Sequence, residues 1–237
     1  MRFLFISNTV LWFKYGFSNI LTIFCISLTV VTFTLWFRDI NRERAYQGQH
    51  TSTVQRGLKW GLIWFLFREV WFFFRVFWAF FHIRLSPLSI RIIVWPRLGL
   101  EPIPAFQVPL LNTIILLIRG VTATLAHQEI LKGSQNIWIF VRGGLGVYFL
   151  TLQGIEYYQS TFNISSRVYG RVFFFGTGFH GLHVCLGIII LITRALRILL
   201  NTITRQHHFS LEFRLWYWHF VDVVWLFLFF WVYAWGC

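Results

Sequence analysis

The chain has 237 residues, of which 57% are hydrophobic, 21% aromatic and 12% charged, and its formal net charge is +13 at pH 7. The charged fraction is about half that of an ordinary soluble domain, and with 29 Phe and 13 Trp it excludes a disordered chain, a collagen-like chain and a conventional soluble enzyme. The basic residues stand in short clusters between apolar stretches, which is typical of loops at a membrane surface and not of a nucleic-acid-binding protein. We therefore interpret the chain as a polytopic membrane protein with no nucleic acid among its partners.

Seven apolar stretches are candidates for membrane-spanning helices, because a helix crosses a hydrocarbon core of about 30 Å with about 20 residues. In chain order they are 1–13, 18–37, 57–81, 103–126, 137–158, 168–191 and 215–235, the first being short for a span. Backbone groups in lipid must be satisfied within the segment, and no barrel-type alternation is visible, so all seven are predicted to be helical. The predicted fold is all-α, a single membrane domain over 1–237. Helices 1 and 2 are placed at about 1–37, a connecting loop at 38–56 and helices 3 to 7 at about 57–236.

The distribution of basic residues predicts an orientation. If the amino terminus and the connections after the second, fourth and sixth segments share one side, that side holds 11 Lys and Arg and the opposite side holds 5. By the positive-inside rule the first side faces the matrix or the cytoplasm, and the loop at 38–56 lies there.

Three acids lie within the predicted spans: Glu69, Glu156 and Asp222. Each costs roughly 2.5–3.5 kcal/mol to insert, so each needs a reason to be there. They could be proton carriers or ion ligands, which would suit a free-standing proton or ion transporter. They could equally be buried, hydrogen-bonded groups at helix contacts, and residue type alone leaves both open.

The histidines of the last two segments invite a metal interpretation. His180 and His183 are three residues apart and share a helix face, and His219 lies in the last segment. A haem or copper site would need these side chains to converge, which the spacing cannot show.

Several stretches resemble the subunit III family of aa3-type cytochrome c oxidases, in the form encoded by mitochondrial genomes. They are FRDINRERAYQGQHT (37–51), FWAFFH (77–82), WP (95–96), VPLLNT (108–113), GVTATLAH (120–127), QGIEYYQSTFNISSRVYG (153–170), TGFHGLHV (177–184) and WYWHFVDVVWLFLF (216–229). The resemblance covers about four fifths of the chain, from Trp36 to the carboxyl end. It implies two bundles, of two and of five helices, separated by a lipid-filled cleft.

The resemblance also implies the function: a subunit without redox centres of its own in respiratory complex IV. Haem a, haem a3 and copper belong to partner subunits in that family. The expected partners are oxidase subunit I as the main contact, subunit II, nuclear-encoded accessory subunits, phospholipids and, in larger assemblies, other respiratory complexes. The chain would support assembly, bind phospholipid and sustain proton uptake. It would lie in the mitochondrial inner membrane with its amino terminus in the matrix and its carboxyl terminus in the intermembrane space.

By the same resemblance, Glu69 matches a buried carboxylate of the third helix that reacts with hydrophobic carbodiimides. Trp36, Glu43, His50 and Arg197 match matrix-side positions around phospholipid head groups. No metal ligand and no catalytic residue is expected. The polar residues expected to serve helix packing are Glu156, His180, His183, His219 and Asp222.

Six arginines fall where the family usually has Ser or another small residue: Arg44, Arg68, Arg75, Arg84, Arg119 and Arg171. Small residues at helix contacts are what close packing in membranes requires. Our hypothesis is that AGA and AGG codons are read as Ser in the source organelle, so that these six residues are Ser in the protein. The presence of only one Met points the same way, because many mitochondrial codes read AUA as Met.

Overall fold

The computed structural model describes residues 20–45, 47–49, 51–85, 101–132, 137–199 and 209–235, together with five residues before position 17. At 41, 44–45, 123–132, 137–140, 142, 167–168, 194–199 and 209–215 only the backbone is described. The predicted first segment lies for the most part outside the described residues, as does His50. The side chains of Arg44 and Arg197 lie outside them too.

The described elements are α2 (Ile20–Ala45), α3 (Ser52–Leu85), α4 (Val108–Lys132), α5 (Ile137–Gln159), α6 (Arg167–Leu199), α7 (Phe209–Leu228) and the π-helix η1 (Phe229–Ala234). No strand occurs in the part of the chain that the structure describes, which confirms the all-α prediction. Six of the seven predicted helices are therefore seen, and the count of seven stays a prediction. Contacts within the chain divide it into two units, 1–57 and 58–237.

In the first unit, α2 is longer than predicted. It continues past position 37 to Ala45, and α3 begins at Ser52, so the connection is 46–51 and the predicted loop at 38–56 was too long. Loss of hydropathy marks the end of the apolar stretch and not the end of the helix, because Arg, Glu and Ala are good helix formers. The turn after α2 has Gly48 at φ +62°, and the Gln49 N–H donates to the Glu43 carbonyl at 3.3 Å, a common way to end a helix.

The hydroxyl groups of α2 bond back to its own carbonyls and do not interrupt its apolar surface. Ser27 donates to Phe24 O, and Thr32 and Thr34 donate to carbonyls three residues earlier, each at 2.8 Å. Such bonds hide the polar hydrogen, so the helix can be surrounded by apolar groups.

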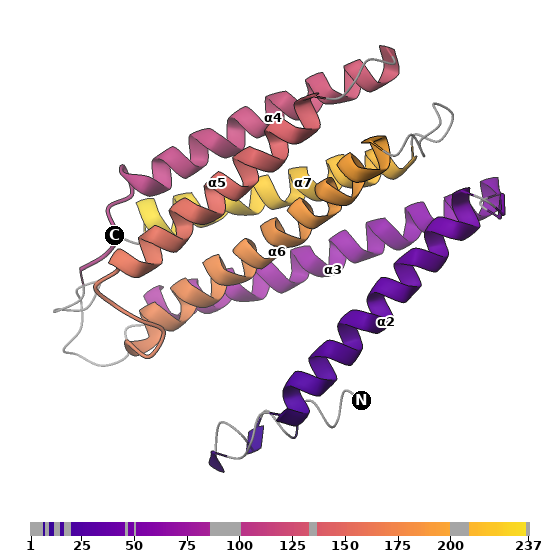
Figure 1. Ribbon diagram of the computed structural model, residues 1–237. Coiled ribbons are helices and arrows are strands. Elements are labelled where there is room, and N and C mark those ends of the chain that lie inside the picture. The colour runs from indigo at the N-terminus through magenta and orange to yellow at the C-terminus, as the bar shows by residue number, and fades with distance from the viewer. Residues whose placement is uncertain are drawn as a thin grey trace. The chain divides into compact units, whose positions relative to one another are not determined.

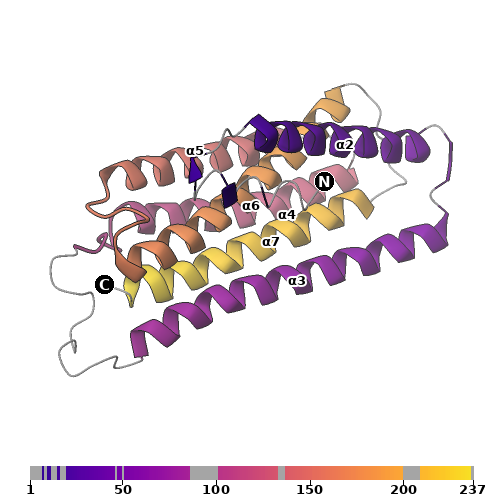
Figure 2. The same cartoon turned by 90° about the horizontal axis from the view of Figure 1, so that it is seen from below.

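In the second unit, α3 to α7 run side by side as a helix bundle (Figures 1 and 2). Backbones come within 8 Å of each other between α4 and α5, α5 and α6, α6 and α7, and α4 and α7. Helix α3 joins this group mainly through large rings, such as Phe72 against Phe179 at 4.8 Å and Phe73 against Phe220 at 6.0 Å between centroids.

The helix bounds differ from the predicted ones for local reasons. Helix α4 begins at Val108 and not at 103, because Pro102 and Pro104 disfavour the helical conformation before them. Helix α6 continues past 191 to Leu199. The last predicted segment ends as the π-helix, where the Trp235 N–H donates to Phe230 O, five residues back, at 2.9 Å.

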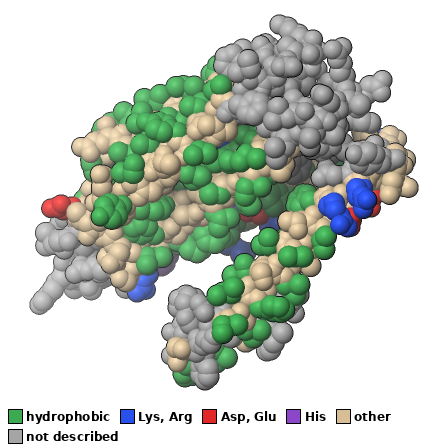
Figure 3. Space-filling view, viewed as in Figure 1, with side chains coloured by type: hydrophobic (Ala, Val, Ile, Leu, Met, Phe, Trp, Pro, Cys, Tyr) green, Lys and Arg blue, Asp and Glu red, His purple; other side chains and the backbone are tan. Residues whose placement is uncertain are grey.

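Three helical windows among the described residues are long and apolar enough to cross a membrane: Ile20–Ile40, Tyr169–Thr193 and Trp216–Ala234. Helix α3 is 34 residues long, about 51 Å, but Arg68, Glu69 and Arg75 along its middle lower its mean hydropathy. The visible face of the 58–237 unit is nevertheless covered mainly by apolar side chains (Figure 3). Burying such a surface requires lipid or other protein chains.

Candidate functional site

The central polar contact of the bundle joins Glu69 of α3 to His183 of α6. The Oε2 atom of Glu69 lies 3.2 Å from Nε2 of His183, and the side chains are 16% and 10% exposed. The other ring nitrogen, Nδ1, lies 2.7 Å from the Phe179 carbonyl oxygen, which can only accept, so Nδ1 carries a hydrogen. A second proton must then lie between Nε2 and Oε2, because two acceptors would otherwise face each other. The pair thus holds one shared proton.

Groups from two helices surround this pair. The Tyr217 hydroxyl of α7 donates to the backbone oxygen of His183 at 2.9 Å, and the ring of Phe73 lies 5.3 Å from the imidazole. Arg68 also approaches the carboxylate, with Nη2 3.6 Å from Glu69 Oε1, but its side chain is 74% exposed. The imidazole lies closer to the carboxylate and is more buried than Arg68, so it is the principal partner of Glu69.

Glu156 belongs to a separate polar cluster. Its Oε1 atom accepts from the Tyr233 hydroxyl at 2.6 Å and from Gln153 Nε2 at 3.2 Å. Gln153 also accepts from Asn112 Nδ2 of α4 at 3.5 Å. This cluster links α4, α5 and the π-helix, while the Glu69 pair links α3 and α6.

The remaining predicted polar residues lie on α6 and α7. His180 is 1% exposed and its Nε2–H donates to the Val221 carbonyl of α7 at 3.2 Å. Asp222 is half-buried on α7, and His219 is exposed on the same helix. Among the described residues, no three side chains of His, Cys, Asp or Glu are grouped so that they could hold a metal ion.

The residues predicted at a lipid head-group site are only partly described. Trp36 is 59% exposed, and Glu43 is exposed one turn beyond the Arg38–Asp39 ion pair, whose atoms are 3.0 Å apart. These charged side chains gather at one end of α2 (Figure 3). Neither His50 nor the Arg197 side chain is described, so the structure does not bring the four predicted residues together.

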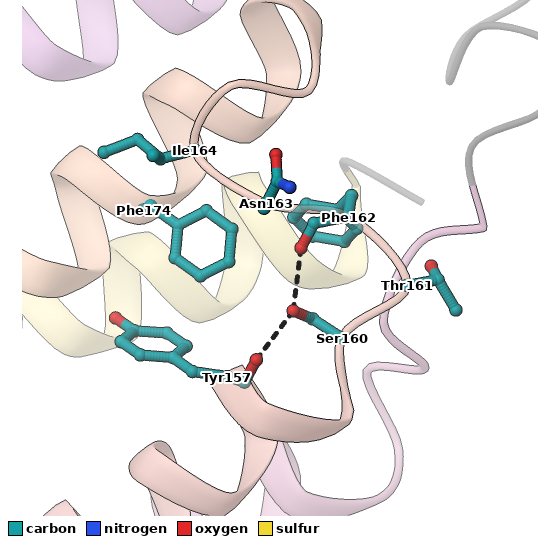
Figure 4. Close-up of a pocket in the computed structure, with 7 residues that line it drawn as sticks. All are labelled: Tyr157, Ser160, Thr161, Phe162, Asn163, Ile164 and Phe174. Atoms are coloured by element: carbon teal, nitrogen blue, oxygen red, sulfur yellow. Dashed lines mark hydrogen bonds between the residues drawn. The ribbon is translucent and has the colours of Figure 1, made fainter.

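An open pocket of about 530 Å³ lies where α5 meets α6 (Figure 4). Its walls are formed by Tyr157, Phe162 and Phe174, and the Ser160 hydroxyl is turned to the carbonyl oxygens of Tyr157 and Phe162, both at 2.8 Å. No charged side chain lines it, and it is about 13 Å along α6 from His183. It is therefore separate from the Glu69 pair.

Comparison with known proteins decides the family. The family model described as cytochrome c oxidase subunit III matches residues 1–237. The chain belongs to the cytochrome c oxidase subunit III family. It is 46% identical to cytochrome c oxidase subunit 3 of Aepyceros melampus and of Tragelaphus imberbis, each over 97% of this chain and 89% of the relative. It is also 46% identical to that of Myxine glutinosa, over 99% of this chain and 90% of the relative.

Membership of the cytochrome c oxidase subunit III family confirms the predicted role as subunit III of complex IV and makes this chain part of an oxidase assembly. The resemblance pointed to Glu69 and the histidines but not to the residues that hold them. Tyr217, Gln153 and Tyr233 were missed. Their polar ends in otherwise apolar helix faces were a usable signal, since a buried Tyr or Gln needs a hydrogen-bond partner.

Proposed function

We propose that this chain is a non-redox core subunit of complex IV in the mitochondrial inner membrane. It stabilises the catalytic core, binds phospholipid and sustains proton uptake while the complex transfers electrons from cytochrome c to oxygen. Its amino terminus faces the matrix and its carboxyl terminus the intermembrane space. It packs chiefly against subunit I, and also against subunit II and accessory subunits. Haem a, haem a3 and copper reside in those partner subunits.

One observation carries the non-redox part of this proposal: the buried histidines are used for helix packing. His180 donates to α7, and His183 donates within α6 and shares a proton with Glu69. Both ring nitrogens of His183 are engaged in this way, so none is left for a metal, whereas His180 has only Nε2 engaged and its buried Nδ1 has no hydrogen-bond partner.

The arrangement of acids does not support the alternative of a free-standing transporter. A transport path needs successive proton or ion sites within reach of one another. Glu69 is paired with His183, and Glu156 is bonded to Tyr233 and Gln153 in another cluster. No described contact connects the two clusters.

Purification of the chain from its source membrane tests the proposal directly. We expect co-purification with haem-bearing subunits, a haem a spectrum for the complex, and no iron or copper retained by this chain after dissociation. Recovery of the chain alone with transport activity in vesicles would contradict it.

The lipid part of the proposal rests on Trp36 and Glu43, at the end of the apolar part of α2, and on the predicted positions His50 and Arg197. In the purified complex, Trp36→Leu should lower the amount of tightly bound phospholipid measured by native mass spectrometry. Phe37→Leu is a matched control, because Phe37 is the next residue and is 57% exposed, against 59% for Trp36. Equal lipid loss in both variants would argue against a specific head-group position at Trp36.

Proton uptake is tested by comparing the complex with and without this chain in vesicles. We expect the depleted complex to retain its haems, to take up protons more slowly and to lose activity during turnover. The Glu69→Gln variant separates the carboxyl group from the rest of the chain. It should abolish carbodiimide labelling of α3 while the complex remains assembled.

A further inference from the structure

We infer that Glu156 is a resident proton site, a neutral carboxylic acid that carries its hydrogen on Oε2 inside the membrane bundle. This goes beyond the proposed function, which assigns Glu156 no role but packing. The inference rests on how the two oxygens of this carboxyl group differ in their surroundings.

The Oε1 atom accepts two hydrogen bonds. It accepts from the Tyr233 hydroxyl at 2.6 Å and from Gln153 Nε2 at 3.2 Å. Gln153 Nε2 also lies 3.2 Å from the Tyr233 oxygen, so both of its hydrogens are used in this cluster.

The Oε2 atom, in contrast, is buried and has no hydrogen-bond partner. Glu156 as a whole is only 3% exposed. A charged oxygen left in that state would carry the whole desolvation penalty of a buried ion. A proton on Oε2 removes the charge and converts an unsatisfied acceptor into a donor.

The same cluster contains a second buried acceptor without a partner. It is the Oδ1 atom of Asn112, a residue 0% exposed, and the Asn112 amide already donates to Gln153. With both atoms as acceptors the cluster lacks donors. With a proton on Glu156 it gains one, and the numbers of donors and acceptors come closer to balance.

No cation is among the described contacts of Glu156, so no ion pair there holds the carboxyl group in its charged form. Two tyrosines are the titratable neighbours with described contacts, Tyr233 from the π-helix and Tyr157 from α5 itself. The Tyr157 hydroxyl is directed away, donating to Thr177 of α6 at 2.7 Å. Helix α4 contributes the amide of Asn112. A hydrogen-bond length of 2.6 Å fits a neutral as well as a charged acceptor, so Oε2 and not Oε1 decides the protonation state.

A fixed proton at this place explains why an acid is tolerated where the π-helix meets α5. The neutral carboxyl group accepts the hydrogen bond of Tyr233 and so holds the π-helix against α5. It does this without a buried counter-cation. Glu156 is then a positioning residue and not a stage of a proton path.

Infrared difference spectroscopy of the intact complex tests the inference, with Glu156→Gln subtracted from the unchanged protein. We expect a carbonyl stretch of a neutral carboxyl group, shifting in D₂O only after long incubation and persisting from mildly acidic to alkaline buffer. In Tyr233→Phe the band should move to higher frequency, because the carbonyl loses a hydrogen bond. Carboxylate stretches at neutral pH in place of that band would overturn the inference.

Assembly gives an independent result. Gln reproduces the shape and neutrality of a protonated Glu, so Glu156→Gln should assemble to the normal amount, whereas Glu156→Ala should not. Failure of Glu156→Gln to assemble would itself count against a neutral acid. Glu101→Gln, at an exposed position before α4, controls for removal of a surface acid and should show only the loss of carboxylate stretches.

Discussion

Helices α3 and α7 both pack against α6, but in different ways. At α7 the contact is close: an added Cβ on Gly187 would lie 2.4 Å from the Trp218 ring, and His180 bonds directly to the Val221 carbonyl. At α3 the helices are held further apart by rings such as Phe72 and Phe179. The one described polar bond across that contact is the Glu69–His183 pair.

The difference shows two ways of stabilising helix contacts where the hydrophobic effect gives little help. In lipid, association depends on close packing and on interhelical hydrogen bonds. The α6–α7 contact uses a glycine and backbone acceptors. The α3–α6 contact has a less tight glycine approach, where a Cβ on Gly176 would lie 3.2 Å from Val76 Cγ1, and relies mainly on aromatic area and one proton-sharing pair. We therefore expect α3 to be the more easily detached of the two.

Removal of His183 should have the largest effect, because this residue takes part in both contacts. In His183→Ala the Glu69 carboxyl loses its main partner and the ring leaves a cavity beside Phe73. We expect a loss of about 2–4 kcal/mol in the free energy of unfolding, measured by denaturant titration of the purified complex. The exposed His219→Ala is the control and should change stability little. Equal losses in the two variants would mean that the pair does not hold α3.

Gly187→Ala acts on the α7 side alone. The new methyl group would meet a rigid indole ring at 2.4 Å, so the helices must move apart at a cost of about 1–3 kcal/mol. Gly178→Ala, on the same helix, meets nothing within 4 Å and should be neutral or slightly stabilising. Thermal dissociation of the complex measures both. A stable Gly187→Ala would show that the α6–α7 contact is less tight than described.

Tyr217→Phe removes a single bond, from the hydroxyl to the His183 backbone oxygen at 2.9 Å. The ring packing stays, so the expected loss is about 0.5–1.5 kcal/mol. Hydrogen exchange of the α6 amides around His183 should increase. Unchanged exchange would indicate that the bond is not maintained in the membrane.

The sequence predicted the helices well and their contacts poorly. Apolar runs placed α2 to α7 and the resemblance placed the family, since both depend on local composition and on residue identity. The extension of α2 through Arg38 to Ala45 was missed because hydropathy indicates which residues can lie in lipid, whereas helix formation beyond the lipid depends on helix propensity. The π-helix was missed because its Phe- and Trp-rich sequence fits an α-helix equally well.

The candidate site was predicted as residues and not as pairs. Glu69 and His183 are 114 positions apart, and nothing in either segment says that they meet. Glu156 and Tyr233 are 77 apart. Such pairing depends on helix register across the bundle, which local sequence patterns do not contain.

Arg68→Ser should have the smallest effect on the comparison. Its side chain is 74% exposed, lies 3.6 Å from Oε1 of Glu69 and 5.5 Å from the Phe65 ring centroid, and contributes nothing to the closer Glu69–His183 bond, which should persist with the smallest change in stability of the variants named here. The same substitution is what a non-standard genetic code would produce in the natural protein. Arg119 is the stronger test of the genetic-code hypothesis, because it is buried where Arg68 is exposed. It is 1% exposed, and its guanidinium lies 3.9 Å from the Trp218 ring centroid.

Peptide mass spectrometry of the natural chain decides the matter. We expect Ser at 68 and 119, and hence no tryptic cleavage after either position. Cleavage after both would establish Arg and end the hypothesis. In that case Arg119 of α4 would be a buried cation stacked on Trp218 of α7, the same ring that meets Gly187 of α6, and Arg119→Ser would become more damaging than Arg68→Ser. Comparing the loss of stability in Arg119→Ser with that in Arg68→Ser then measures how differently the closely packed region around Trp218 and the exposed side of α3 tolerate the same substitution.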